Sequence, residues 1–220
     1  MNNLRHQIPL KSREIRFMHR FWDERYQEEG VYGKAPNPFW VDQLSQRVPQ
    51  PGADRILLPC EGEGRNAVWA AKHGWRVDAF DASSVALATC QRWASEAGVS
   101  VNTVHCDALD FASPPNHYAV IGFFYAHFTS ELRQVVHQRA TQWLQPGGLV
   151  ILEGFNPLQL QRQSGGPKMI EMLYTPQLLG QDFDALFVHQ NTTLVAELNE
   201  GPYHQGMAEL IRFVGEKPVQ

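Results

Sequence analysis

From Asp54 onward, short apolar runs alternate along the chain with segments in which apolar residues recur at helical spacing. The apolar runs lie at residues 56–58, 75–80, 101–105, 118–124 and 149–153, and the helical segments lie at 65–73, 83–97 and 130–144. Each run has about the length of a buried strand, and strands that alternate with helices form a parallel sheet. The pattern therefore predicts a doubly wound α/β domain with five parallel strands.

The two flanks of this alternating region differ from it. The aromatic-rich stretch 17–44 predicts one or two helices, interrupted at Gly30-Val31-Tyr32-Gly33. Segment 156–168 is polar and rich in glycine, which predicts a mobile loop. Final runs at 183–193 and 207–215 predict two antiparallel strands that turn near Gly201-Pro202. The whole chain, residues 1–220, is predicted to be a single domain.

Composition and charge narrow the class of protein. Of the 220 residues, 43% are hydrophobic and 19% are charged, and no stretch approaches the roughly 20 apolar residues that a membrane helix needs. Nineteen Lys and Arg against 23 Asp and Glu give a net charge of -4, so we expect neither a nucleic acid nor a membrane as partner. The three cysteines lack CxxC spacing, and the first residues lack an apolar signal region. We therefore expect a reduced, cytoplasmic protein.

The clearest chemical motif is Cys60-Glu61-Gly62-Glu63-Gly64-Arg65-Asn66, which lies between a predicted strand and a predicted helix. Glycine at such a turn lets a ligand approach the backbone, and a helix N-terminus favours negative groups. The next strand ends at Asp81, where a carboxylate can accept hydrogen bonds from both hydroxyls of a ribose. Together these features predict nucleoside binding, although Asp81 can instead cap the helix that follows it.

Two more groups follow strands at the same edge of the predicted sheet. Asp107, with Ala108 and Leu109, follows the third strand, where its carboxylate can bind an adenine amine or simply lie in a solvated loop. Tyr125 and His127 follow the fourth strand, and a histidine in such an aromatic stretch is about as often packed as functional. The nine histidines show no HxxxH or HxH spacing and no GxSxG motif is present, so neither a metal site nor a hydrolase triad is predicted.

Residues 50–155 carry these motifs in an order that resembles a class I S-adenosylmethionine-dependent methyltransferase. Motifs in both flanks narrow the resemblance to the tellurite-resistance and thiopurine-methyltransferase-like branch. These motifs are Phe21-Trp22-Asp23-Glu24-Arg25-Tyr26, Tyr32-Gly33, Pro36-Asn37 and Glu200-Gly201-Pro202-Tyr203-His204-Gln205-Gly206. Two positions depart from the family pattern, because Cys60 replaces a glycine and Leu58 replaces an acidic residue.

The resemblance implies a Rossmann-like methyltransferase fold, a doubly wound and mostly parallel seven-stranded sheet. Residues 1–50 would form an N-terminal helical cap, 51–155 the cofactor-binding core, and 156–220 the substrate side with a C-terminal antiparallel hairpin. The implied cofactor is S-adenosylmethionine, with Gly62 and Gly64 at its methionine portion, Asp81 at its ribose, and Asp107, Ala108 and Leu109 at its adenine. Further cofactor contacts are expected from Trp22, Tyr32, Cys60, Glu61, Asn66, Ala82 and Phe124. The candidate catalytic residues are Tyr125, His127 and His204, and Arg212 is a further candidate beside the acceptor.

We therefore predict an enzyme that transfers a methyl group to a small-molecule acceptor, expected to be a soft nucleophile such as a thiol or another chalcogen. An ionised soft nucleophile needs no general base, which suits a sequence without an evident acid/base dyad. Segments 17–32 and 159–167 are expected to cover the pocket as a lid. Two alternatives stay open, a non-catalytic S-adenosylmethionine-binding protein and a nicotinamide-dependent oxidoreductase, because a glycine turn followed by an acidic residue fits both cofactors.

Overall fold

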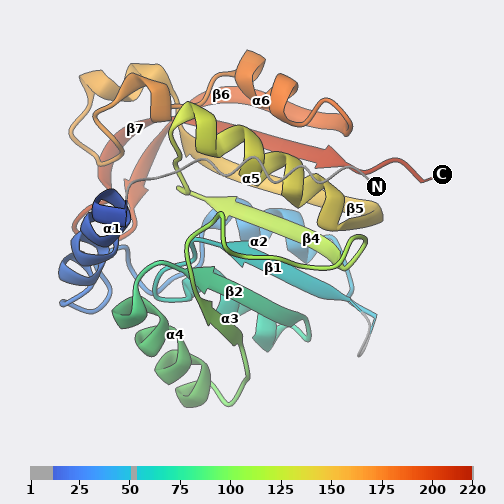
Figure 1. Ribbon diagram of the computed structural model, residues 1–220, viewed down its shortest axis with the longest axis horizontal. Coiled ribbons are helices and arrows are strands. Elements are labelled where there is room, and N and C mark those ends of the chain that lie inside the picture. The colour runs from blue at the N-terminus through green and yellow to red at the C-terminus, as the bar shows by residue number, and fades with distance from the viewer. Residues whose placement is uncertain (1–11, 51–53, 220) are drawn as a thin grey trace.

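A computed structural model of the chain describes residues 12–50 and 54–219, and its centre is a seven-stranded sheet (Figure 1). The strands are β1 (Arg55–Pro59), β2 (Arg76–Asp81), β3 (Asn102–His105), β4 (Tyr118–Phe124), β5 (Leu144–Phe155), β6 (Phe187–Asn199) and β7 (Gln205–Glu216). Their spatial order is β3-β2-β1-β4-β5-β7-β6, and β7 runs antiparallel to both of its neighbours. The predicted fold class, a mostly parallel seven-stranded α/β sheet, is confirmed.

Helices cover both faces of the sheet. α2 (Pro38–Ser45), α3 (Arg65–Lys72) and α4 (Ser84–Glu96) pack on one face, and α5 (Ser130–Trp143) and α6 (Pro176–Asp182) pack on the other. Strand β1 contributes to both cores, because Leu57 faces the α5 side whereas Ile56 and Leu58 face the α2 and α3 side. All three side chains are fully buried, which explains the unbroken apolar sequence of this central parallel strand.

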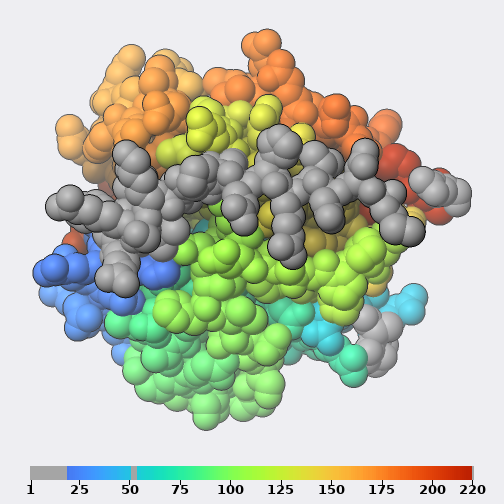
Figure 2. Space-filling model, in the orientation of Figure 1, coloured from blue at the N-terminus to red at the C-terminus, as the bar shows by residue number. Residues whose placement is uncertain are grey.

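The carboxyl ends of the parallel strands form the edge at which a ligand can bind. β1 pairs with β2 on one side and with β4 on the other, so the strand order reverses at β1. Open α/β sheets bind ligands in the crevice at such a reversal. Helix α1 (Ser12–Arg25) lies beside this edge (Figure 1), and in Figure 2 its blue surface lies against the green residues of α4.

The C-terminal hairpin forms as predicted, but its first strand is shifted along the chain. The predicted strand 183–193 begins too early, because α6 extends to Asp182 and β6 begins only at Phe187. Thr175 caps α6 by accepting a hydrogen bond from the backbone N–H of Leu178 (3.2 Å), and Pro176 occupies the first turn. Phe183 therefore ends a helix, and its side chain is fully buried beneath it.

Segment 156–168, predicted to be a mobile loop, is instead partly helical, and buried hydrogen bonds anchor it at Gln159 and Ser164. The segment begins with the 3₁₀ helix η1 (Pro157–Gln161), and a second one, η2 (Ile170–Met172), follows it. The Gln159 amide, 1% exposed, donates to Ser164 Oγ and to the Gly165 carbonyl (both 3.0 Å). Its oxygen accepts from the backbone N–H of Glu209 (2.8 Å). The buried polar side chains of this segment, Gln159 and Ser164, therefore bond within the protein.

Two remaining expectations concern the cap and the membrane. Residues 1–11 of the predicted cap lie outside the described residues. Among the helices that the structure describes, none combines the length and the apolar character needed to cross a membrane.

Candidate functional site

The turn between β1 and α3 is held by the carboxylate of Glu61. Its Oε1 accepts hydrogen bonds from the backbone N–H groups of Asn66 and Ala67 (both 2.8 Å), so Glu61 satisfies donors at the start of α3. Burial raises the pKa of Glu61 to about 7. The neighbouring Glu63 points elsewhere, because its Oε1 accepts from the backbone N–H of Gly30 (2.7 Å). The two carboxylates of the motif thus diverge and form no acid/base pair.

Both glycines of the motif have left-handed backbone, and side chains of this chain pack against each of them. Gly62 has a φ of 65°, and the Tyr26 hydroxyl lies 2.5 Å from the position that a β-carbon on Gly62 would take. Gly64 has a φ of 87°, and Cys90 Sγ occupies the corresponding position there. Cys60 is also left-handed, with a φ of 54°, which explains why glycine is common at this point of the family motif.

Asp81 lies at the carboxyl end of β2 and faces this turn. Its Oδ2 accepts from the backbone N–H of Gly62 (2.9 Å), and its Oδ1 accepts from that of Ser83 (2.8 Å). Burial raises the pKa of Asp81 to about 6. Ser83, rather than Asp81, caps α4, because Ser83 Oγ accepts from the backbone N–H of Ala86 (3.1 Å). Each Asp81 oxygen keeps a lone pair, which leaves Asp81 able to bind a hydroxyl.

Asp107 follows β3 on the adjacent strand of the sheet, and Asp81 pairs in register with His105. Asp107 Oδ1 accepts a hydrogen bond from His19 Nε2 of α1 (2.8 Å). Ala108 is buried beside it. His105, at the end of β3, donates from Nε2 to the carbonyl of Ala82, which directly follows Asp81 (3.0 Å). The structure thus brings the carboxylates predicted to bind ribose and adenine to neighbouring strand ends.

The aromatic residues of the N-terminal segment gather over the same turn. The rings of Trp22 and Tyr26 stack at 6.0 Å, and Tyr32 meets Tyr26 edge-on at 5.9 Å. Arg25 donates to the Tyr32 hydroxyl (3.3 Å) and stacks on the Tyr203 ring at 3.9 Å. The predicted contacts Trp22 and Tyr32 therefore lie with the glycine turn, and they bring the 203–204 turn next to it.

His204 lies in an aromatic enclosure on the opposite side of Tyr32. Its ring is 4.7 Å from that of Tyr32, 4.3 Å from Tyr125 and 5.3 Å from Phe155. The Nδ1 of His204 is buried without a hydrogen-bond partner, and Glu200 Oε2 lies 4.0 Å from it. Burial, with the charge of Arg65, holds the pKa of His204 well below its ordinary value. A neutral imidazole thus lies beside Tyr125, another residue that the sequence predicts to lie near the acceptor.

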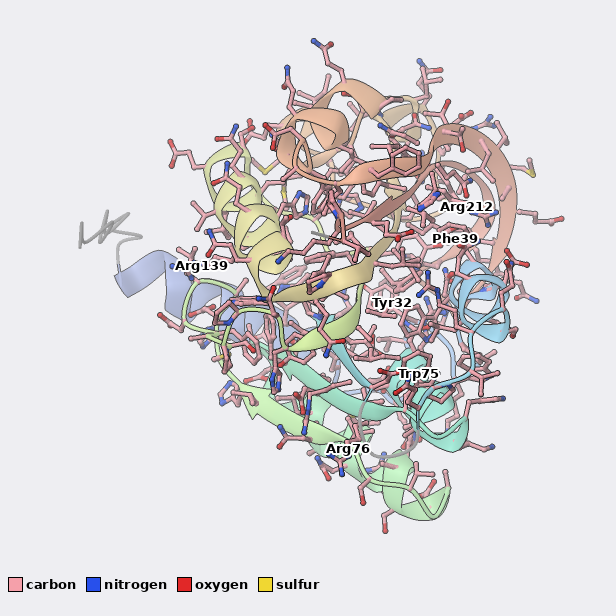
Figure 3. All side chains as sticks on the ribbon, turned by 90° about the vertical axis from the view of Figure 1, so that its right-hand side faces the viewer. Tyr32, Phe39, Trp75, Arg76, Arg139 and Arg212 are labelled. Atoms are coloured by element: carbon pink, nitrogen blue, oxygen red, sulfur yellow. The ribbon has the colours of Figure 1, made fainter. Side chains whose placement is uncertain are left out.

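The sequence did not reveal the two ion pairs that frame this enclosure. Arg65 Nη2 pairs with Glu200 Oε2 (2.6 Å), and Arg212 Nε pairs with Glu153 Oε2 (2.5 Å). Arg212 also lies over the ring of Phe39 at 4.6 Å, as Figure 3 shows. The Tyr125 hydroxyl donates to Glu153 Oε1 (3.2 Å). Because each pair joins residues far apart in the chain, only the folded structure reveals them.

Three of the predicted site residues have structural partners. His127 Nδ1 donates to the carbonyl of Met172 (2.7 Å), and its Nε2 accepts from the backbone N–H of Phe155 (3.1 Å), so both ring nitrogens are bonded. The ring of Phe124 packs edge-on against Trp40 at 5.3 Å. Asn66 Oδ1 accepts from the backbone N–H of Asn37 (2.8 Å). These arrangements favour packing roles, and the predicted roles of the three in binding or catalysis stay predictions.

The residues at the strand ends fit a nucleoside cofactor. Asp81 and Asp107 present carboxylate acceptors on adjacent strands, and the groups to be bound, ribose hydroxyls and an adenine amine, are donors. Ala108 and Leu109 supply apolar surface next to Asp107, where an aromatic base can pack.

Comparisons with known proteins agree with this geometry. Residues 56–148 match a family model described as a methyltransferase domain. No curated protein sequence matches the chain. A solved structure described as "Conversion of a Disulfide Bond into a Thioacetal Group during Echinomycin Biosynthesis" has a TM-score of 0.74 at 15% identity, over 91% of this chain and 92% of the other.

Two further solved structures are similar in fold. TehB from Haemophilus influenzae has a TM-score of 0.66 at 12% identity, over 90% of this chain and 66% of that one. The N-methyltransferase NodS from Bradyrhizobium japonicum WM9, in complex with S-adenosyl-L-homocysteine, has a TM-score of 0.66 at 13% identity, over 91% and 98%. At such identities the matches show the fold. The family-model match over residues 56–148 bears out the predicted enzyme class, a methyltransferase, with S-adenosylmethionine as its cofactor.

Proposed function

We propose that this protein binds S-adenosylmethionine across the carboxyl ends of β1, β2 and β3 and transfers its methyl group to a small-molecule thiol or another chalcogen. The observation that carries the proposal is the placement of Asp81 and Asp107 on adjacent strand ends, beside the left-handed turn at Gly62. Within this arrangement Asp81 binds the ribose hydroxyls and Asp107 the adenine amine. The Asp81 carboxylate is already oriented by the backbone N–H groups of Gly62 and Ser83, so little ordering of this side chain accompanies binding.

The acceptor lies between Tyr125 and His204 in this proposal. The bound cofactor supplies a methyl group on a positively charged sulfur, which is a good leaving group. The protein aligns the acceptor and excludes water, and the rings of Tyr32, Tyr125 and Phe155 enclose the space beside His204 for that purpose. His204 is neutral, so it can orient an anionic acceptor through a ring N–H.

A soft nucleophile suits this enclosure better than a hydroxyl. A hydroxyl acceptor has to lose its proton to a base, whereas the carboxylates of Glu153 and Glu200 nearby are already paired with Arg212 and Arg65. The flanking motifs point to the tellurite-resistance and thiopurine-methyltransferase-like branch, whose resemblance implies the same acceptor class. The similar structure described for conversion of a disulfide bond into a thioacetal group also concerns sulfur chemistry.

Titration calorimetry with S-adenosylhomocysteine tests the cofactor site. A hydrogen bond to a charged group contributes roughly 1.5–3 kcal/mol, so Asp81→Ala should weaken binding by about one to two decades. The exposed Asp42→Ala, on α2, serves as a matched control. An unchanged affinity in a folded Asp81→Ala protein would refute the ribose role.

The acceptor class is tested by assaying a thiol and a hydroxyl compound of matched shape. We expect turnover of the thiol only, with a rate that rises with pH until the thiol ionises. Turnover of the hydroxyl compound alone would refute the assignment to a soft nucleophile.

A further inference from the structure

Three side chains of the N-terminal segment 19–26 contact the surface proposed for the cofactor. His19 Nε2 donates to Asp107 Oδ1 at 2.8 Å. Asp23 Oδ1 accepts from Ser83 Oγ (2.7 Å) and from the backbone N–H of Val85 (3.4 Å), directly after Asp81. The Tyr26 hydroxyl lies over Gly62, 2.5 Å from the position of a β-carbon there. One short segment thus reaches the ends of β1, β2 and β3 together.

Two of these three contacts occupy positions that the cofactor would need. An adenine amine would present an N–H donor to Asp107, and His19 presents an N–H donor to the same carboxylate. Gly62 lacks a side chain, which leaves room for a ligand to approach the backbone, and the Tyr26 phenol fills that room. The third point, Asp23 on Ser83, fixes the segment between the other two.

We infer that segment 19–26 is an intramolecular competitor of S-adenosylmethionine, holding the adenine and methionine positions until the cofactor displaces it. The inference rests on the cofactor placement proposed above. A ligand that shares contacts with a segment of the protein binds only the fraction of molecules in which that segment has left. The affinity of the cofactor is therefore set partly by His19 and Tyr26, although neither would touch it.

The surroundings of the segment allow it to leave. An open pocket of about 480 Å³ lies between Tyr26, Gln27 and Glu29 and the α4 residues Val85, Ala88 and Arg92. His19 and Asp107 are each about a third exposed, with side-chain exposures of 30% and 27%, so water reaches their hydrogen bond. Moving the segment outward leaves both cores of the sheet intact, and it gives up the separate small apolar cluster that Tyr26 forms with Val31 and Ala86.

Removing the His19 contact tests the inference, because competition predicts that the affinity for S-adenosylhomocysteine rises and not falls. A hydrogen bond to a charged group, reduced by this exposure, corresponds to about a threefold to tenfold change in a binding constant. We expect His19→Ala to bind S-adenosylhomocysteine about threefold to tenfold more tightly than wild type, measured by titration calorimetry. The control is His189→Ala, which removes a pair with Glu216 of the same 2.8 Å length at the other end of the sheet.

Each outcome of this titration either supports the inference or overturns it. Tighter binding in His19→Ala together with unchanged binding in His189→Ala supports competition. Weaker binding would make His19 a cofactor contact, and unchanged binding would make it irrelevant; both overturn the inference while leaving the cofactor placement intact. Failure of that placement shows separately, as unchanged affinity in Asp81→Ala.

Hydrogen exchange gives a second readout that needs no variant. If the cofactor displaces the segment, amides of residues 20–26 should exchange faster when S-adenosylhomocysteine is bound. Slower exchange would mean that the segment closes over the ligand as a lid, and this result would overturn the inference.

Discussion

Replacing His127 by phenylalanine separates a structural role from a catalytic one. The imidazole stacks between the rings of Phe155 (5.6 Å) and Tyr174 (4.8 Å), nearly parallel to both, and phenylalanine keeps that stacking. The substitution leaves the Met172 carbonyl and the Phe155 N–H without their partner. Each of these two unsatisfied groups costs about 1–3 kcal/mol, so we expect the free energy of unfolding at neutral pH to fall by about 2–6 kcal/mol.

The same variant changes how stability depends on pH. Burial lowers the pKa of His127 to about 4 from its ordinary value of 6.5. Between these two values the unfolded chain takes up a proton that the folded protein does not, so the folded state loses stability as the pH falls from 6.5 to 4. The loss amounts to at most about 3 kcal/mol, since His127 is half-buried rather than fully buried. His127→Phe lacks this loss, and the difference from wild type should shrink on acidification.

Urea unfolding at about pH 8 and about pH 4.5 measures both effects. His73→Phe is the matched control, because His73 is exposed on the surface next to Trp69. A difference between wild type and His127→Phe that is the same at both pH values would refute the reasoning. The methyl-transfer rate of the folded variant at about pH 8 completes the test. Loss of a general base would lower this rate by about 10²–10⁴-fold, and a smaller loss would support the structural role of His127.

The other predictions concern the glycine turn and His204. Cys60→Gly should keep cofactor affinity and stability, measured by calorimetry and thermal unfolding, because its φ of 54° favours glycine. Gly64→Ala should lower the free energy of unfolding by about 2–5 kcal/mol through backbone strain and collision with Cys90, whereas Gly98→Ala, equally left-handed but facing open space, should lose only about 1–2 kcal/mol. Equal losses would contradict this account. His204→Ala should reduce thiol turnover about tenfold by losing orientation, and a 10²–10⁴-fold loss would instead identify a base.

The sequence predicted the parallel core well because one periodic signal dominates each element. β2, for example, lies at Arg76–Asp81 where residues 75–80 were expected, and α4 lies at Ser84–Glu96 where 83–97 was expected. Each of these elements buries apolar side chains at the spacing that its own geometry requires. Helix α6 was not predicted although Thr175-Pro176 signals its start, because the helix has only seven residues and includes Gly180.

The candidate site was less predictable, because its contacts depend on distant parts of the chain. Asp81 and Asp107 could be found, since each directly follows an apolar run. Tyr26 could not be assigned to Gly62, nor His19 to Asp107, because the path of α1 over the sheet edge is set by tertiary packing. The roles of Glu61 and Gly64 were also hidden, since the sequence does not tell whether a turn holds a ligand or its own helix.

The hydrogen bonds of Asn37 indicate which boundaries a fragment of this chain needs in order to fold by itself. Its backbone N–H reaches Asn66 on α3 (2.8 Å), and its amide reaches Glu153 on β5 (2.6 Å), which also binds Arg212 on β7. A fragment cut to the matched residues 56–148 would lose Asn37, Glu153 and Arg212 and expose the apolar surface that Trp40 covers on β1 and β4. Chimaeras that exchange acceptor specificity should therefore be joined outside Asn37 and Arg212, with the unit between them transplanted whole.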